Sequence, residues 1–258
     1  MKKWLCALLF VASPSFANTF SSDFSDLWWN ANESGWGVTV TQQQEVVFLT
    51  FFVYGVDGRP VWYTGQGSYA SVSAQGGFVF TGQMYQTTGP WLGSLFNTNQ
   101  VTNRPVGTLT FTAFLYSATL AYTIDGVTVN KSLTRQTFRN NSLAGEYMGT
   151  IKSVQSGCRA PFPNGDFNRY IDVSISHFGS TVAMTIRETD GSFCNYSGNY
   201  TQGGKLGRSQ GTTTCSSGAT GTYDAIEIEA GISGLIARFN SSNNFCTSVS
   251  GRLTLMKK

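Results

Sequence analysis

The sequence predicts an all-β protein made of two antiparallel up-and-down (meander) β-barrel-like domains, with roughly eight strands in each. Three observations support this prediction. Only 12% of the residues are charged, whereas glycines (29) and aromatic side chains (14%) are plentiful, a composition typical of strands and turns. Turn-forming residues recur at regular spacing in the second half. Between the turns, apolar and polar residues alternate.

The first residues have the features of a signal peptide. Lys2 and Lys3 precede an apolar run, and Ser15-Phe16-Ala17 fits the small-x-small cleavage pattern. We therefore expect removal of residues 1–17 and export to the periplasm or the extracellular space. Without the two lysines the formal net charge falls from +3 to +1, which favours neither nucleic acid nor acidic lipid as a partner. No later apolar run has the length of a membrane span.

Tryptophans and cysteines divide the remaining chain into two halves. The tryptophans after the signal peptide all lie before residue 100, at Trp28, Trp29, Trp36, Trp62 and Trp91. The cysteines after it all follow residue 150, at Cys158, Cys194, Cys215 and Cys246. We expect a Trp-rich domain at 18–140 and a disulfide-containing domain at 141–258. Each half is long enough for a core of its own.

In the first half, alternation and turn residues predict seven strands, with an eighth near Trp91–Phe96. The seven ranges are 35–42, 45–55, 60–69, 77–87, 107–114, 117–124 and 127–138. Trp28 and Trp29 then precede the first strand, where periodicity does not fix them. Because adjacent residues of an extended chain point in opposite directions, one can cover the barrel end while the other is exposed to a sugar ring or a partner protein.

The second half is predicted to open with a strand at 143–151 and to continue as consecutive hairpins. Its turns are expected at 178–180, 190–191, 202–204, 216–218, 230–231 and 241–243. Apolar residues between them share single faces, as do Ile171, Val173 and Ile175. An eight-stranded meander removes its own sheet edges by closing into a barrel.

The hairpin geometry selects one of the three pairings that four cysteines allow. Cys194 and Cys215 lie at equal distances from the centre of the turn near Gly204, so they face each other across the hairpin. This leaves Cys158 to pair with Cys246. Since these two residues belong to the first and last strand regions of the half, their disulfide requires a closed barrel.

Closure of the first barrel would place Trp36, on its first expected strand, beside Arg135, on its last. A guanidinium over an indole face is a favourable cation–π contact. Lipocalin-type barrels close one end with a Gly-x-Trp strand and an arginine, and Trp36 with Arg135 resembles this arrangement. The likeness implies architecture only, so we expect these two residues to form a structural plug.

The opening WWNANESGWG and the hairpin that follows resemble a module of exported proteobacterial proteins. The matching positions are Trp28–Asn30, Glu33–Gly37, Gln42, Gln43, Gly58–Pro60, Trp62 and Tyr63. In that module a Gln-Gln turn and an apolar strand precede a Gly-(Arg/Lys)-Pro-x-Trp-Tyr hairpin. The resemblance covers residues 28–63, with a Cys-containing β domain as the companion. It implies an exported proteobacterial protein and no particular activity.

The sequence contains no convincing set of catalytic residues. We therefore expect that the protein is not an enzyme and that it has no cofactor or metal site. The single histidine, His177, continues the apolar face of a strand, which favours a structural role over that of a base or a haem ligand. Glu33 lies among tryptophans without a second local carboxylate, so capping of the turn is the expected role.

Binding is therefore the expected function, as an exported non-catalytic binding or surface protein with an unknown protein or carbohydrate as its partner. One alternative is an inhibitor of an extracytoplasmic protease or lysozyme, and another is a hydrolase that uses Glu33 or another carboxylate. The candidate ligand or partner contacts are Trp28, Trp29, Glu33, Trp62, Arg159, Phe162 and Arg169.

Two surfaces are singled out for binding. Phe48, Phe52 and Tyr54 share one face of their strand with Trp62 of the next, and this aromatic patch should be buried against the second domain or another subunit. The segment 156–169 reads as a long loop stiffened by two prolines and Cys158. Arg159 and Arg169 would grip an acidic group there, unless the loop only caps the core with Phe162 inside.

Overall fold

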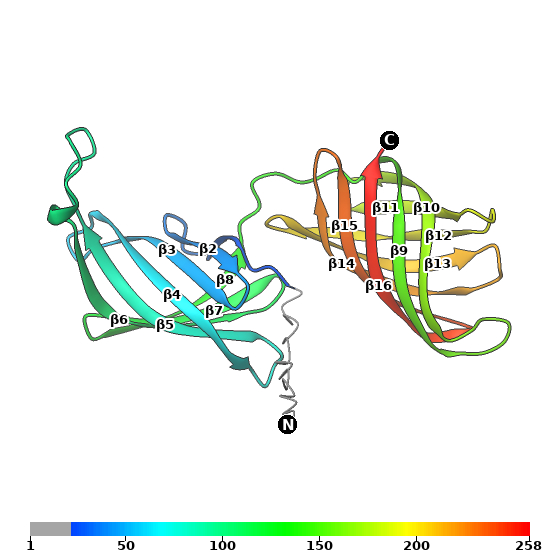
Figure 1. The fold of residues 1–258 in the computed structure, drawn as a ribbon, viewed down its shortest axis with the longest axis horizontal. Helices are drawn as coiled ribbons and strands as arrows, with labels where there is room; N and C mark the ends of the chain where they lie inside the picture. The colour runs from blue at the N-terminus through cyan, green and yellow to red at the C-terminus, as the bar shows by residue number, and fades with distance from the viewer. Residues whose placement is uncertain (1–21) are drawn as a thin grey trace, which may run out of the picture.

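The computed structural model describes residues 22–258, so the expected signal peptide at 1–17 lies outside the described residues. The described chain forms two closed antiparallel barrels in meander order, β1–β8 and β9–β16, as Figure 1 shows. The predicted fold class is confirmed. Nowhere in residues 22–258 does a helix have the length and hydrophobicity needed to cross a membrane.

The first barrel contains eight strands and one short 3₁₀ helix. They are β1 (Asp26–Trp29), β2 (Gly37–Gln43), β3 (Val46–Tyr54), β4 (Pro60–Val72), β5 (Phe78–Thr88), η1 (Thr98–Gln100), β6 (Thr102–Ala113), β7 (Ser117–Ile124) and β8 (Val127–Arg135). The prediction of an eighth strand near Trp91–Phe96 is wrong, because these residues form a loop. The eighth strand is instead β1, which contains Trp28 and Trp29 and closes the barrel by pairing with both β2 and β8.

The second barrel follows residues 136–144 and contains the other eight strands. They are β9 (Gly145–Cys158), β10 (Gly165–Phe178), β11 (Thr181–Glu188), β12 (Phe193–Gly203), β13 (Leu206–Cys215), β14 (Thr220–Ala230), β15 (Gly234–Asn243) and β16 (Cys246–Lys257). β9 pairs with both β10 and β16, so the first and last strands close the cylinder.

The interior of the first barrel is filled by large apolar side chains. Phe24, Trp28, Phe80 and Phe111 are fully buried and form a chain of edge-to-face or tilted ring contacts, and the buried Phe51 packs edge to face on Tyr122. Such a core is close-packed, so the interior of the first barrel is filled by its own side chains.

The second barrel is packed at one end only. Leu143 and Tyr147 form this end with Tyr200 and Ile228, and the Tyr147 hydroxyl donates to the Leu143 carbonyl. His177 belongs to the same end, where its Nδ1 accepts from the Leu143 amide at 3.1 Å and its ring packs edge to face on Tyr200. The expected structural role of the histidine therefore agrees with its contacts.

Both disulfides form with the predicted pairing. Cys194 lies directly opposite Cys215 in the β12–β13 ladder, and Cys158 lies opposite Cys246 in the β9–β16 ladder. The second disulfide therefore joins the strands that close the barrel.

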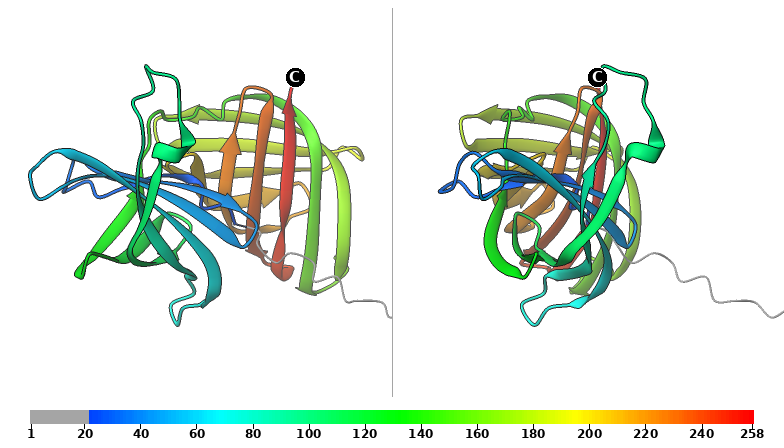
Figure 2. Two further views of the ribbon diagram at one scale, coloured as in Figure 1. Left: turned by 60° about the vertical axis from the view of Figure 1, so that its left-hand side comes forward. Right: turned by 90° about the vertical axis from the view of Figure 1, so that its left-hand side faces the viewer.

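The barrels touch where the β12–β13 turn meets the start of the first barrel. Lys205 donates to Asp26 through its amide and to Asp23 through its ammonium group. Gly204, with φ of +60°, leaves no room for a larger residue, because an added Cβ would lie 2.1 Å from an Asp26 oxygen. Tyr116 donates to the Gly207 carbonyl, and burial raises the pKa of its hydroxyl to about 12. The further views in Figure 2 show the two barrels adjoining.

Candidate functional site

Trp28 and Arg135 form the plug of the first barrel, so the predicted Trp36–Arg135 pairing is wrong. The two residues are register partners on β1 and β8, and the guanidinium lies 4.6 Å from the centre of the Trp28 ring. The prediction placed the first strand one strand too late. Trp28 is fully buried and its indole donates to the Phe24 carbonyl, so it is not accessible to a ligand.

Trp36 covers the opposite end of the first barrel together with Glu33 and Lys131. Its indole donates to Glu33 Oε2 at 3.1 Å, and the Lys131 ammonium donates to the same oxygen at 2.6 Å. The hydrogen bond from Lys131 holds the pKa of Glu33 below its usual range. Glu33 is therefore ionised near neutral pH, which is unlike the raised pKa that a general acid needs.

The aromatic patch of Phe48, Phe52, Tyr54 and Trp62 lies on the outer surface of the first barrel. Phe52 faces Trp62 across the β3–β4 ladder, and all four side chains are between 45% and 56% exposed. The expectation that the second domain buries this patch is wrong, and the alternative of another subunit stays a proposal. Trp29 is half-buried in a shallow depression with Phe114, away from these residues.

The long loop expected at 156–169 is wrong in its bounds, because β9 and β10 extend into it and leave only 159–164. Pro161 and Pro163 lie between the two strand ends and favour the prediction of a loop, while few apolar residues mark the strand ends themselves. Phe162 packs against Phe245 in a tilted arrangement with ring centroids 4.7 Å apart, and the guanidinium of the exposed Arg159 lies over the same Phe245 ring. The loop is thus fastened to the β15–β16 turn, and Arg159 does not line the cavity beneath it.

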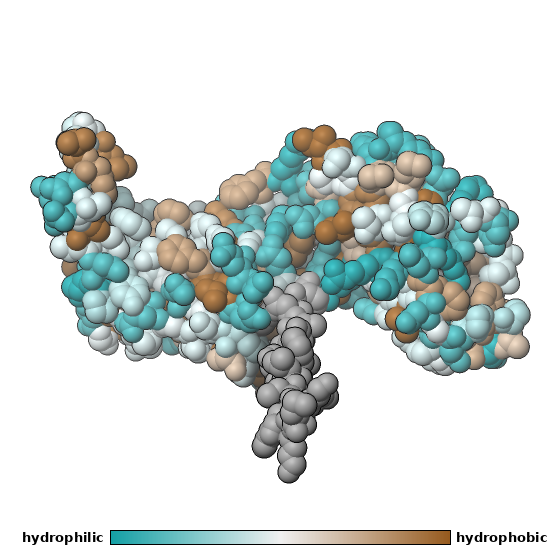
Figure 3. Space-filling model, in the orientation of Figure 1, coloured by the Kyte–Doolittle hydropathy of each residue, from teal (hydrophilic) through white to brown (hydrophobic). Residues whose placement is uncertain are grey.

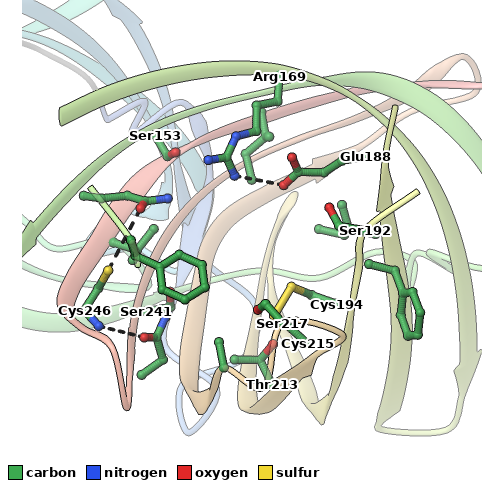
Figure 4. Close-up of a pocket in the computed structure, with 18 of the residues that line it drawn as sticks. Ser153, Arg169, Glu188, Ser192, Cys194, Thr213, Cys215, Ser217, Ser241 and Cys246 are labelled. Atoms are coloured by element: carbon green, nitrogen blue, oxygen red, sulfur yellow. Dashed lines mark hydrogen bonds and ion pairs between the residues drawn. A yellow bond between two sulfur atoms is a disulfide. The ribbon is translucent and has the colours of Figure 1, made fainter. Parts of the chain in front are cut away.

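Arg169 instead lies within β10 and lines a cavity, which opens at the end of the second barrel that points away from the first barrel. Its Nη1 donates to Glu188 Oε1 on β11 at 2.8 Å, and its guanidinium lies over Phe167. Both charged side chains line the cavity and are about one-third exposed, at 36% and 29%. Figure 4 shows them facing each other, with Cys194 and Cys215 lying further along the wall.

The cavity has a volume of about 460 Å³ and contains both apolar and polar wall residues. Besides the ion pair, it is lined by Ile151, Ser153, Gln155, Phe162, Ile186, Asp190, Ser192, Phe193, Tyr196, Thr213, Phe239, Ser241 and Asn243, with cysteines from both disulfides. The turns β11–β12, β13–β14 and β15–β16 surround its opening. In an up-and-down barrel these turns lie at the end opposite the β12–β13 turn, so the mouth faces away from the first barrel.

Tyr196 and Tyr223 separate the cavity from the packed end. Their rings meet edge to face with centroids 5.2 Å apart, and the Tyr223 hydroxyl bonds Ser209 at 2.9 Å. Burial raises the pKa of Tyr196. Thr213 faces this phenol, and its buried hydroxyl makes no hydrogen bond of regular geometry within the described residues. A buried hydroxyl without a well-formed bond is uncommon in native structures.

Of the predicted binding residues, the structure brings Phe162 and Arg169 together at this cavity, and it places Trp29, Glu33, Trp62 and Arg159 elsewhere. Sequence reasoning missed Glu188, Tyr196 and Thr213. Each lies on the inward face of its strand, where apolar residues give way to polar ones towards the mouth of the cavity. This change from apolar to polar residues along a strand is the sequence signal that could have indicated them.

A scan against protein-family models, a search of curated proteins and a search of solved structures each return no match to the chain. The function is therefore inferred from the geometry of the cavity and of the surfaces.

Proposed function

We propose that the protein is an exported binding protein that takes a small carbohydrate ligand into the open mouth of its second barrel. The cavity, with the Arg169–Glu188 pair among aromatic side chains, is the observation that carries the proposal. Its volume of about 460 Å³ falls in the ordinary range of small-molecule sites. Export is supported by the two disulfides, which persist in oxidising compartments, and by the expected signal peptide.

The chemistry of the walls suits a sugar ring. A guanidinium supplies hydrogen-bond donors and a carboxylate supplies acceptors, so Arg169 and Glu188 can together bond neighbouring hydroxyls. Phe162, Phe193 and Tyr196 offer ring surfaces for the C–H face of a pyranose. A fully apolar ligand would leave the ion pair without new partners, so a ligand with both polar and apolar faces is favoured.

The proposal is tested with a panel of neutral pyranoses, amino sugars, uronic acids and their disaccharides, followed by saturation-transfer NMR on the full chain. We expect saturation transfer to at least one of these classes. Replacing Arg169 with methionine should weaken that binding roughly tenfold or more, because charged hydrogen bonds are lost. Arg252→Met is the control, since Arg252 is exposed on the outer face of β16. The proposal would be contradicted if both variants reduced binding equally, or if no sugar of the panel bound to the protein.

We also propose that the aromatic patch of the first barrel mediates self-association. Four aromatic side chains that are half exposed present roughly 300–500 Å² of apolar surface. A standard interface buries about 800 Å² from each partner, so this patch supports only a weak, reversible dimer.

Sedimentation velocity over a range of protein concentrations tests the self-association. We expect a concentration-dependent increase in mass that Phe52→Ser combined with Trp62→Ser removes. Tyr170→Ser, at a residue 74% exposed on the second barrel, should leave the increase unchanged. A protein that stays monomeric at every concentration would contradict this role of the patch.

A further inference from the structure

The loop between β5 and β6 carries a second exposed apolar feature, which is separate from the aromatic patch. Trp91, Leu92, Leu95 and Phe96 form what we call the β5–β6 tip, and these side chains are 79%, 83%, 96% and 51% exposed. The loop projects from the first barrel in Figures 1 and 2, and its end is strongly hydrophobic in Figure 3. Such a cluster is costly to keep in water, so it calls for a partner.

The tip lies in a long stretch of sequence without charge. From Pro60 to Asn103 there is no aspartate, glutamate, lysine or arginine. Arg104, the next charged residue, is held by Asp125 in a bidentate ion pair. The tip can therefore leave water without desolvating an ionised side chain, which is the largest cost of entering a lipid phase.

Local hydrogen bonds already satisfy part of the loop backbone. The Trp91 carbonyl accepts from both the amide and the hydroxyl of Ser94. At the base of the loop, Asn97 caps η1 by accepting from the Asn99 amide, and its carbonyl accepts from Gln100. Lipid offers no partners for bare backbone groups, so bonds within the loop lower the cost of insertion.

We propose that the β5–β6 tip inserts into the interface of an uncharged lipid bilayer. A projection of four side chains offers too little surface for a stable protein interface of standard size. A lipid interface requires no matching groove, tryptophan favours that depth, and leucine and phenylalanine gain free energy by burial there. Because the loop has no basic residues, no electrostatic attraction draws it to acidic lipid, so insertion requires only an uncharged bilayer.

Insertion at the tip leaves the second barrel free. Tyr116 follows the end of β6 and contacts the second barrel, whereas the tip precedes the start of β6. The tip and the second barrel therefore lie at opposite ends of the first barrel. A protein anchored in this way would hold the cavity mouth away from the lipid surface.

Flotation of the full chain with phosphatidylcholine vesicles tests the proposal. The protein should float with the vesicles at both low and high salt, because no charge attraction is involved. Leu92→Ser combined with Leu95→Ser should lower the partition coefficient roughly a hundredfold, since two apolar side chains are lost from the buried set. The matched control is Phe178→Ser, at the end of β10, combined with Ile232→Ser, in the β14–β15 turn. These two apolar residues of the second barrel are 90% and 100% exposed, and the control should float like the unmodified chain.

Brominated lipid chains report the depth of insertion independently. They should quench part of the tryptophan emission of the unmodified chain, and Trp91→Phe should remove that quenching while flotation persists. The proposal would be overturned if the unmodified chain did not float, or if it floated only with acidic vesicles at low salt. It would also be overturned if the control variant lost as much flotation as the double leucine variant. A tip that instead joins two copies would show as an increase in mass that the double leucine variant removes without any vesicle binding.

Discussion

Replacing Arg135 with methionine is expected to destabilise the first barrel by about 3–5 kcal/mol, the usual cost of breaking a buried ion pair by removing one partner. The Arg135 side chain is fully buried, and Asp26, its carboxylate partner at 3.1 Å, is only 10% exposed. The guanidinium also donates to the carbonyls of Leu115, Ser25 and Asp23. These part-buried acceptors would be left with fewer donors, while the cation–π contact with Trp28 would be lost.

Tryptophan fluorescence during urea unfolding measures this effect, because every tryptophan in the described residues belongs to the first barrel. Arg104→Met is the control, since its ion pair with Asp125 is half exposed and solvent screening should leave it a far smaller effect on stability. Replacing Arg135 and Asp26 together by methionine and leucine should recover part of the loss, because no buried charge is left alone. Equal costs for Arg135→Met and Arg104→Met would show that the plug does not stabilise the barrel.

Removal of the Cys158–Cys246 disulfide is expected to destabilise the second barrel by about 4–5 kcal/mol in the chain-entropy model. Its cysteines are 88 residues apart, and they join the strands whose pairing closes the cylinder. The Cys194–Cys215 disulfide spans only 21 residues within one hairpin, so its removal should cost about 3 kcal/mol.

Far-UV circular dichroism during denaturant unfolding compares the two double alanine variants, because the second barrel has no tryptophan. The larger loss should follow removal of Cys158 and Cys246. The reverse order would mean that closure of the barrel by β9 and β16 contributes less than the single β12–β13 hairpin.

The sequence predicted the fold well where alternation and turn residues agree. The β12–β13 hairpin is an example, since its turn residues set the register that brings Cys194 opposite Cys215. The first strand failed for a physical reason. β1 contains only four residues, Asp26–Trp29, which is too short for any alternation to be recognised. The expected first strand therefore begins at residue 35, next to the true β2, and the predicted plug residue becomes Trp36 in place of Trp28.

The cavity was harder to predict because its walls do not follow the pattern of a packed core. Along β10, the inward face changes from apolar Ile171, Val173 and Ile175 to Arg169 towards the mouth. Such a face has the polarity of a solvent-exposed one, so the sequence predicts a loop at Arg169. Glu188 was missed because its partner lies on a neighbouring strand, and only the barrel closure brings the ion pair to the inside.

Blocking the mouth of the second barrel tests the central proposal most directly. Ser241 lines the cavity from β15, whereas its neighbour Ser242 is exposed on the outer face. Saturation-transfer NMR with the sugar panel should therefore lose its signals in Ser241→Phe and keep them in Ser242→Phe, provided that circular dichroism shows both variants folded. Signals that survive in Ser241→Phe, or that disappear equally in both variants, would contradict binding inside the second barrel.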